Sequence, residues 1–187
     1  MPPKTRPTVL VVDDEPEVAD VYALRLDSDY ETRVAYSGEA ALDTIDDEID
    51  VVLLDRRMPN LSGDELLDII RSDGYDCRVI MLTAVDPGLD IVELPFDDYL
   101  CKPVEKDDLV AAIEQQLEIK RHDERVIEYL ELRAKQSLLS ADSDEPDADK
   151  LVALQERMTQ LRAELNDGER EALSDLEEAF VSVNREP

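Results

Sequence analysis

Short apolar runs alternate with amphipathic stretches along roughly the first two thirds of the chain. The apolar, often β-branched runs predict strands, and the stretches with apolar residues at helical spacing predict helices. The predicted strands are residues 8–14, 32–36, 51–55, 78–84 and 98–102, and the helices between and after them are residues 15–27, 37–48, 62–74 and 104–120. Strands that alternate with helices form βαβ units. The pattern therefore predicts an α/β fold, with a five-stranded, parallel, doubly wound sheet that helices cover on both faces.

Several residues with strong positional preferences mark the ends of these helices. Pro16 stands at a helix start, where a missing backbone N–H is tolerated. Ser37 and Ser62 stand where a side-chain oxygen can accept a hydrogen bond from the first turn, and Gly74 follows the helix that Ser62 begins. These residues support the helix starts that the periodicity indicates.

Only helical patterns follow the last predicted strand and its helix. No Gly or Pro interrupts residues 104–144, so we expect the helix that begins near residue 104 to run on through residues 126–138. Residues 141–149 are acidic and contain Pro146, which predicts an exposed linker or turn.

Two leucine-striped segments complete the chain, at residues 150–165 and 169–183. Their apolar residues recur at alternating three- and four-residue steps, which is typical of a coiled coil or a helical hairpin. Each stripe is short, so we leave both antiparallel packing within the chain and association with a second copy open. The sequence thus predicts an all-α tail behind an α/β domain.

Polar residues end four of the five predicted strands. Asp13 and Asp14 end the first, Asp55 the third, Thr83 the fourth and Lys102 the fifth. Because parallel strands all point the same way, their carboxyl ends form one rim of the sheet, where ligands bind. We therefore expect these side chains to converge.

The chemistry of these side chains suggests a metal ion and a phosphoryl group. Three carboxylates close together repel one another and need a cation, and all-oxygen ligands favour Mg²⁺. A lysine and a hydroxyl beside them suit a phosphoryl group that the metal also contacts. A carboxylate such as Asp55 can then attack phosphorus and become an aspartyl phosphate.

The charge of the chain narrows the classes of partner. Asp and Glu number 48 against 20 Lys and Arg, a net charge of −28 in 187 residues, and the acids are spread along the whole chain. Such a protein repels nucleic acid and anionic membranes, and it suits a cytoplasm of high salt, where ions screen the repulsion. We therefore expect a protein from a halophile.

Two further features concern the compartment. Cys77 and Cys101 each lie in or beside an apolar run, which predicts buried free thiols rather than a disulfide or a metal site. The opening residues lack the apolar core of a secretion signal, and no apolar run approaches the ~20 residues that span a bilayer. We expect a soluble, cytoplasmic protein without membrane contact.

The motifs at the strand ends resemble those of the receiver domain of two-component response regulators. The matching segments are "VVDDE" (11–15), "LLDRRMP" (53–59), "MLTA" (81–84) and "DDYLCKP" (97–103). The resemblance covers roughly residues 8–120. It implies a flavodoxin-like fold, Mg²⁺ as cofactor, and a histidine kinase or phosphotransfer protein as phosphodonor.

The resemblance also implies roles for individual residues. Asp55 matches the phosphoacceptor, and Thr83 and Lys102 match the residues that grip the phosphoryl oxygens. Asp13, Asp14, Asp55 and the backbone carbonyl of Arg57 match the Mg²⁺ ligands.

Two residues near the fifth strand also match family features. Tyr99 matches the aromatic switch residue that acts with Thr83; a half-buried edge tyrosine is the alternative. The Lys102–Pro103 peptide bond is expected to be cis.

The segment between Thr83 and Tyr99 departs from the family pattern. It contains Pro87, Gly88 and Pro95, so we expect the family's fourth helix to be short or distorted.

The tail resembles the HalX domain, a helical module found after receiver domains in halophilic archaea. The resemblance rests on "YLELRAKQSLLSA" and the two striped segments. We therefore expect a receiver domain at residues 1–119 and a HalX-like helical domain at residues 120–187.

Other functions remain open. An Asp-nucleophile phosphatase is disfavoured, because haloacid-dehalogenase-type enzymes place a D-x-D pair after the first strand. Residues from Lys120 onward have 10 basic and 18 acidic side chains and show no basic stripe, so DNA binding is an alternative that charge does not favour. A helical tail that binds a protein or forms a homodimer is preferred. His122, the only histidine, lies in the charged stretch "KRHDER", so the chain accepts phosphate rather than donating it from histidine.

Overall fold

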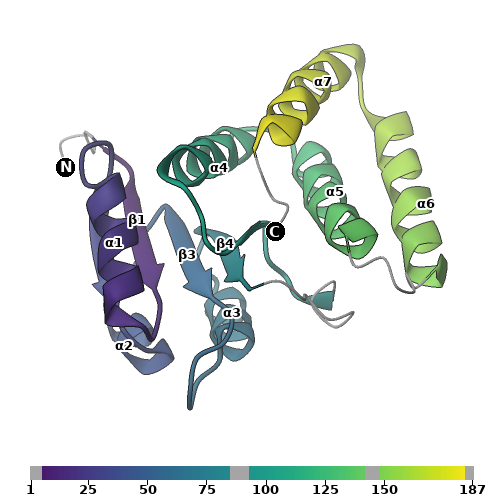
Figure 1. Cartoon of the computed structure of the whole chain (residues 1–187). Helices are drawn as coiled ribbons and strands as arrows, with labels where there is room; N and C mark the ends of the chain where they lie inside the picture. The colour runs from purple at the N-terminus through teal and green to yellow at the C-terminus, as the bar shows by residue number, and fades with distance from the viewer. Residues whose placement is uncertain (1–5, 85–92, 142–147, 184–187) are drawn as a thin grey trace.

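The computed structural model describes residues 6–84, 93–141 and 148–183, with side chains described up to residue 139 in the second range. The elements are β1 (Thr8–Val12), α1 (Pro16–Leu26), β2 (Glu31–Ala35), α2 (Gly38–Thr44), β3 (Val51–Asp55), α3 (Gly63–Ser72), β4 (Arg78–Thr83), β5 (Asp98–Cys101), α4 (Lys106–Ile119), α5 (Glu124–Ala141), α6 (Ala148–Glu164) and α7 (Asp167–Ser182). Figure 1 shows an α/β part followed by the helices of the tail. The predicted fold class is confirmed.

The five strands form one parallel sheet in the order β2-β1-β3-β4-β5. In a strand, successive side chains point to opposite faces, and a sheet covered on both sides is apolar on both. One face packs against α1 and α4, and the other packs against α2 and α3. Every residue of β1 and β3 is buried, as the apolar runs predict.

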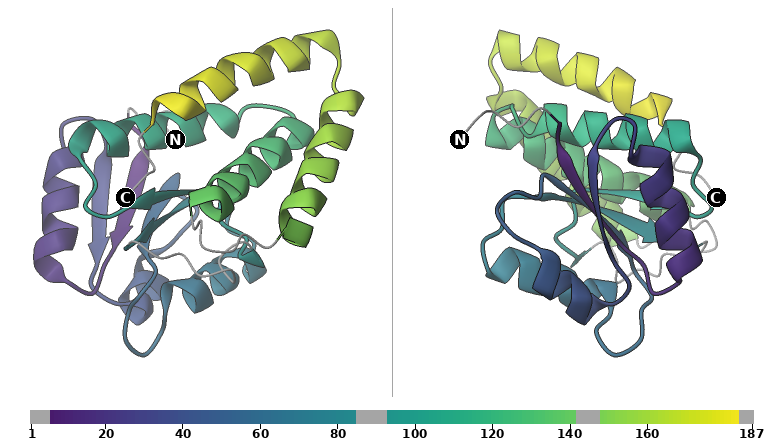
Figure 2. Two further views of the ribbon diagram at one scale, coloured as in Figure 1. Left: turned by 45° about the vertical axis from the view of Figure 1, so that its right-hand side comes forward. Right: turned by 90° about the vertical axis from the view of Figure 1, so that its left-hand side faces the viewer.

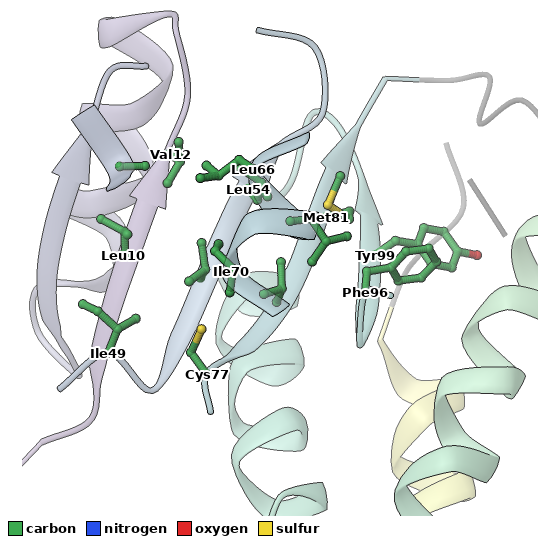
Figure 3. Close-up of a cluster of buried hydrophobic side chains, with 14 of the residues drawn as sticks. Leu10, Val12, Ile49, Leu54, Leu66, Ile70, Cys77, Met81, Phe96 and Tyr99 are labelled. Carbon is green, nitrogen blue, oxygen red and sulfur yellow. The ribbon is translucent and has the colours of Figure 1, made fainter. Parts of the chain in front are cut away.

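The register aligns one row of side chains across the sheet. Val12 pairs with Leu54, Leu54 with Met81, and Met81 with Tyr99. These four residues belong to the buried cluster on the α2 and α3 face, which Figure 3 shows. The cluster continues beyond β5 into α5 through Ala134 and Leu138.

The predicted helix starts are confirmed. The Ser37 hydroxyl accepts a hydrogen bond from the Ala40 N–H at 3.0 Å. Ser62 and Glu65 form a reciprocal capping box at the start of α3, which satisfies two backbone donors that the helix cannot pair itself.

The prediction of one continuous helix from residue 104 through residue 138 is wrong, because α4 ends at Ile119 and α5 begins at Glu124. The chain tightens into a turn in which the His122 N–H donates to the Ile119 carbonyl at 3.0 Å. The Asp123 carboxylate then accepts the Arg125 N–H at 3.0 Å and starts a new helix. An aspartate that pairs with the backbone can end one helix and begin another without Gly or Pro.

The tail packs within the chain as well as against the sheet. A third buried cluster joins Ile119 of α4 to residues of α5, α6 and α7. Figure 2 shows α7 running alongside α4, and α5 lying between the sheet and α6. The striped segments therefore fold back within the same chain.

Other expectations concern particular residues. Cys77 is a buried free thiol, as predicted, whereas Cys101 is a free thiol that is only partly buried. The Lys102–Pro103 peptide bond is cis. The expected irregular fourth helix falls largely on residues 85–92, and the expected linker largely on residues 142–147, so both lie outside the described residues.

Candidate functional site at the carboxyl ends of the strands

Three carboxylates meet at the carboxyl ends of β1 and β3. Asp13 follows β1 and is fully buried, and Asp55 is the last residue of β3. Because Val12 pairs with Leu54, the parallel register places Asp13 beside Asp55. One carboxylate oxygen from each of Asp13, Asp14 and Asp55 lies within 4.8 Å of the others. The predicted convergence of the acids is present.

The ammonium group of Lys102 joins two of these acids. Its Nζ atom lies 2.6 Å from Asp13 Oδ2 and 2.5 Å from Asp55 Oδ1. The Lys102 backbone N–H donates to the Thr83 carbonyl at 2.7 Å, which anchors the residue at the end of β4. One positive charge thus lies among three acids at a rim that also contains a hydroxyl.

The surroundings shift the proton affinities of the paired groups. Burial raises the pKa of Asp55 above its usual range, while the hydrogen bond from Lys102 acts in the opposite direction. For Lys102, burial alone lowers the pKa, but the hydrogen bonds to Asp13 and Asp55 outweigh it, so the net pKa is raised. Lys102 therefore remains a cation at neutral pH.

Thr83 and Arg57 lie in the neighbourhood that the strand order predicts. Asp55 pairs with Leu82, so the buried Thr83 stands one residue beyond the acid on the neighbouring strand. Its hydroxyl donates to the Ala84 carbonyl at 3.0 Å. Arg57 lies in the loop that follows β3, with an exposed side chain.

Tyr99 is buried rather than half-buried. Its side chain is 3% exposed, and it belongs to the cluster that contains Phe96, Ala134 and Leu138. Figure 3 places Tyr99 and Phe96 next to each other at one end of the labelled side chains. The alternative of a half-buried edge tyrosine is wrong, because the tail covers this edge of the sheet.

The loop after Asp55 contains a pair of residues that the sequence did not reveal. The Arg56 guanidinium donates to both oxygens of the Asp64 carboxylate. Its Nε atom lies 3.1 Å from Oδ1 and 3.3 Å from Oδ2, and its Nη2 atom lies 3.1 Å from Oδ2. The Gly63 N–H donates to the Arg56 carbonyl at 3.0 Å. The spacing of the residues in these two contacts matches neither the helical nor the strand repeat, so no pattern in the sequence could have identified them.

Within the part of the chain that the structure describes, no helix combines the length and apolar character needed to cross a membrane.

Comparison with known proteins agrees with this geometry. Residues 9–114 match the family "Response regulator receiver domain". A Haloferax volcanii protein, provisionally named a transcriptional regulator, is 45% identical over 161 residues. That match covers 83% of this chain but only 27% of the relative, so the chain spans about a quarter of that relative's length.

Solved structures are similar over the α/β part. A response regulator receiver domain protein from Clostridium thermocellum is 32% identical with a TM-score of 0.56, covering 62% of this chain and 97% of that one. A CheY-like receiver domain protein from Methanospirillum hungatei is 26% identical with a TM-score of 0.58, covering 62% and 97%. The family match spans more than half of the chain and includes the acidic rim. The chain therefore belongs to the response regulator receiver family of two-component signalling proteins.

Proposed function

We propose that this protein accepts a phosphoryl group on Asp55 from a histidine kinase or a phosphotransfer protein, with Mg²⁺ as cofactor. The observation that supports this best is the position of Lys102 Nζ, 2.6 Å from Asp13 and 2.5 Å from Asp55, beside a third acid. A cation fixed at the acceptor carboxylate suits the negative charge of an incoming phosphoryl group.

The proposed transfer is a displacement at phosphorus. An Asp55 carboxylate oxygen forms a P–O bond while the bond from phosphorus to the donor's imidazole nitrogen breaks, and the bonding electrons return to that nitrogen. Lys102 and the Thr83 hydroxyl are proposed to bind the phosphoryl oxygens. The protein is thus a phosphoacceptor that promotes its own phosphorylation and dephosphorylation, rather than an enzyme with a separate substrate.

The acidic cluster fits a magnesium site. Its carboxylate oxygens are hard ligands, and their spacing within 4.8 Å suits one small cation. Asp13, Asp14, Asp55 and the Arg57 carbonyl are the proposed ligands. When bound, Mg²⁺ would offset the charge that builds up on the phosphoryl oxygens.

We propose that residues 1–119 form the receiver domain and residues 120–187 a HalX-like output domain. Tyr99 is the proposed switch residue with Thr83, and the buried cluster that it shares with Ala134 and Leu138 connects the receiver to the tail. The output is proposed to be binding of a protein or of a second copy of the chain.

Control of transcription is a second candidate, which the provisional name of the Haloferax volcanii relative favours. Direct DNA contact by the tail is less favoured, because its 18 acids outnumber its 10 bases.

The acceptor assignment can be tested by labelling with acetyl phosphate and Mg²⁺ in molar KCl. Intact-mass measurement should show one added phosphoryl group on the wild type, and none on Asp55→Asn or in the presence of a chelator. Asp43→Asn, at an exposed position on α2, should be labelled as the wild type is. Equal labelling of the Asp55→Asn protein would refute the assignment.

A further inference from the structure

Helix α5 of the tail covers the edge strand of the sheet. Among the described residues, β5 pairs only with β4, and exposed strand edges invite unwanted pairing unless something covers them. Ala134 and Leu138 of α5 share a buried cluster with Phe96 and Tyr99. The Lys135 ammonium lies 5.5 Å from the centre of the Phe96 ring. The contact between α5 and the β5 edge is therefore both apolar and charged.

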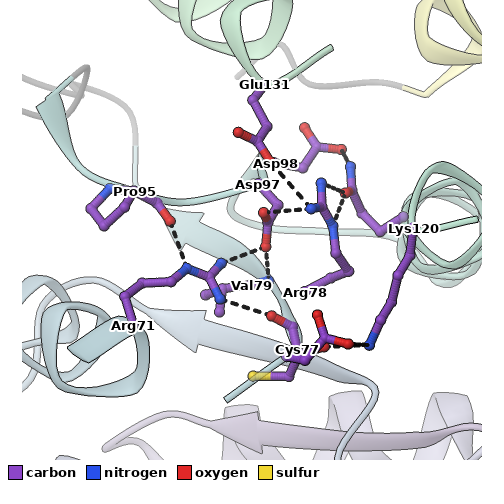
Figure 4. A network of polar contacts seen from close by, with 11 residues as sticks. Arg71, Cys77, Arg78, Val79, Pro95, Asp97, Asp98, Lys120 and Glu131 are labelled. Carbon is purple, nitrogen blue, oxygen red and sulfur yellow. Dashed lines mark hydrogen bonds and ion pairs between the residues drawn. The ribbon is translucent and has the colours of Figure 1, made fainter. Parts of the chain in front are cut away.

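A cluster of polar side chains crosses this contact at the amino ends of β4 and β5, far along the strands from Asp55. Figure 4 shows it. Arg78, the first residue of β4, lies 2.9 Å from Asp97 Oδ1 and 3.2 Å from Glu131 Oε1. It also donates to Gln116 Oε1 of α4 at 2.9 and 3.1 Å. One guanidinium group thus connects β4, the start of β5, α4 and the tail.

Asp97 has a full set of partners without the tail. Its carboxylate pairs with Arg71 at 2.6 Å and with Arg78, and it accepts the Val79 N–H. The side chain is only 6% exposed, so these donors surround it almost completely. Glu131 approaches this buried anion from α5.

The Glu131 carboxyl lies close to that of Asp97, because the same Arg78 nitrogen, Nη1, contacts both, at 3.2 Å and 2.9 Å. Two negative charges brought together in a mostly buried site repel each other, so this arrangement favours a proton on one of the two groups. Burial and the Asp97 charge raise the pKa of Glu131 to about 7, although Arg78 acts in the opposite direction. The proton therefore belongs on Glu131, the acid with fewer donors.

We propose that Glu131 is a proton-dependent latch: the docked tail holds a proton on Glu131 beside Asp97 and Arg78, and loss of that proton to solvent weakens the contact between α5 and the β5 edge. The latch requires no phosphorylation and goes beyond the acceptor function of Asp55.

The direction of the pH effect follows from the two states. The pKa of Glu131 is the ordinary 4.5 when α5 is released and about 7 when α5 is docked. The docked state therefore binds more protons than the released state between pH 4.5 and pH 7. Docking is strongest below pH 4.5, weakens as the pH rises, and levels off above about pH 7. From pH 6 to pH 8.5 the docking equilibrium should fall on the order of tenfold.

Other charged or titratable groups lie near Glu131, and their effects on docking must be distinguished from its own. Arg71 and Arg78 pair with Asp97, and the buried Asp98 accepts a hydrogen bond from Gln116 at 3.2 Å. Burial lowers the pKa of Lys135, so its titration favours docking as the pH rises, opposite to Glu131. Burial raises the pKa of the Cys77 thiol, which keeps it neutral here. Replacing Glu131 alone isolates its contribution.

The test is hydrogen–deuterium exchange of the full chain in molar KCl from pH 6 to pH 8.5, corrected for intrinsic exchange. Peptides that cover β5 and residues 126–139 should lose protection on the order of tenfold in the wild type. Glu131→Gln, which mimics the protonated acid, should stay protected at every pH. Glu128→Gln should behave as the wild type, because Glu128 pairs with Arg157 at an exposed site within the tail.

A wild type whose protection does not change with pH would overturn the proposal, as would an equal loss of protection in Glu131→Gln. If that variant fails to fold, a carbon-13 titration of the Glu131 carboxyl in the wild type decides the question. A midpoint near 7 supports the latch, and an ordinary midpoint near 4.5 contradicts it.

Discussion

At the scale of single residues, Gly63 controls how closely the loop after β3 approaches the proposed acceptor. A Cβ atom at this position would lie 2.2 Å from the Asp55 carbonyl oxygen and 2.8 Å from Arg56 Cα, distances that no real contact allows. The Gly63 N–H also donates to the Arg56 carbonyl. Only glycine lets the start of α3 pack directly on the backbone of Asp55.

We therefore expect Gly63→Ala to destabilise the protein and to displace the loop that contains Arg57. The cost should be about 1–3 kcal/mol, as for other overpacked sites, and labelling of Asp55 by acetyl phosphate should slow. Chemical denaturation and the labelling assay measure the two effects.

Gly168→Ala is the matched control for this change. A Cβ there meets only the Asn166 side chain, at 3.5 Å, and alanine favours a helix such as α7. Equal stability of the Gly63→Ala protein and the wild type would show that the loop can move without loss.

At the scale of helices, α5 has two different partners. Val126, Tyr129 and Leu130 pack with α6 and α7, whereas Ala134, Leu138 and Leu139 belong to the buried cluster that covers one face of the sheet. Arg125 also joins the three tail helices, because it pairs with Glu169 at 2.9 Å and donates to the Glu164 carbonyl at 2.8 Å. The tail thus has a small core of its own and a second face that the rest of the chain covers.

This division predicts how the tail behaves alone. Residues 120–187, expressed as a fragment, would expose Ala134, Leu138 and Phe180, which are buried in the whole chain. Helices of this length are marginal in water without packing. We expect a poorly folded monomer or an associated species in molar salt, measured by light scattering and circular dichroism. A monodisperse monomer with a cooperative melt would show instead that the tail folds independently.

At the scale of the whole molecule, charge repulsion opposes folding. The net charge is −28, and the described ion pairs, such as Arg33 with Asp46, neutralise only part of the 48 acids. Repulsion extends over a Debye length of ~30 Å at 0.01 M salt but only ~3 Å at 1 M. A relative from Haloferax volcanii agrees with the halophilic origin that the composition predicts.

Stability should therefore depend strongly on salt. We expect circular dichroism melts to show a marked fall in Tm between molar and millimolar KCl. Sucrose at matched viscosity serves as a control, since it favours compact states without screening charge. A Tm that is unchanged between the two salt concentrations would refute this expectation.

The sequence alone determined the α/β part and most of its candidate site. Short apolar runs that alternate with amphipathic stretches predict a parallel sheet, and parallel strands bring their carboxyl ends to one rim. Asp13, Asp14, Asp55 and Lys102 could be placed together for that reason, because each directly follows or ends a strand.

Only the tertiary structure decided how the tail meets the sheet. The break between α4 and α5 needs no Gly or Pro, since the Asp123 carboxylate accepts the backbone N–H of Arg125 and starts the new helix. Once the chain turns there, α5 reaches the β5 edge, buries Tyr99 and brings Glu131 to Arg78, 53 positions earlier in the chain. Local periodicity reports which face of a helix is apolar, but it does not report which distant surface that face meets.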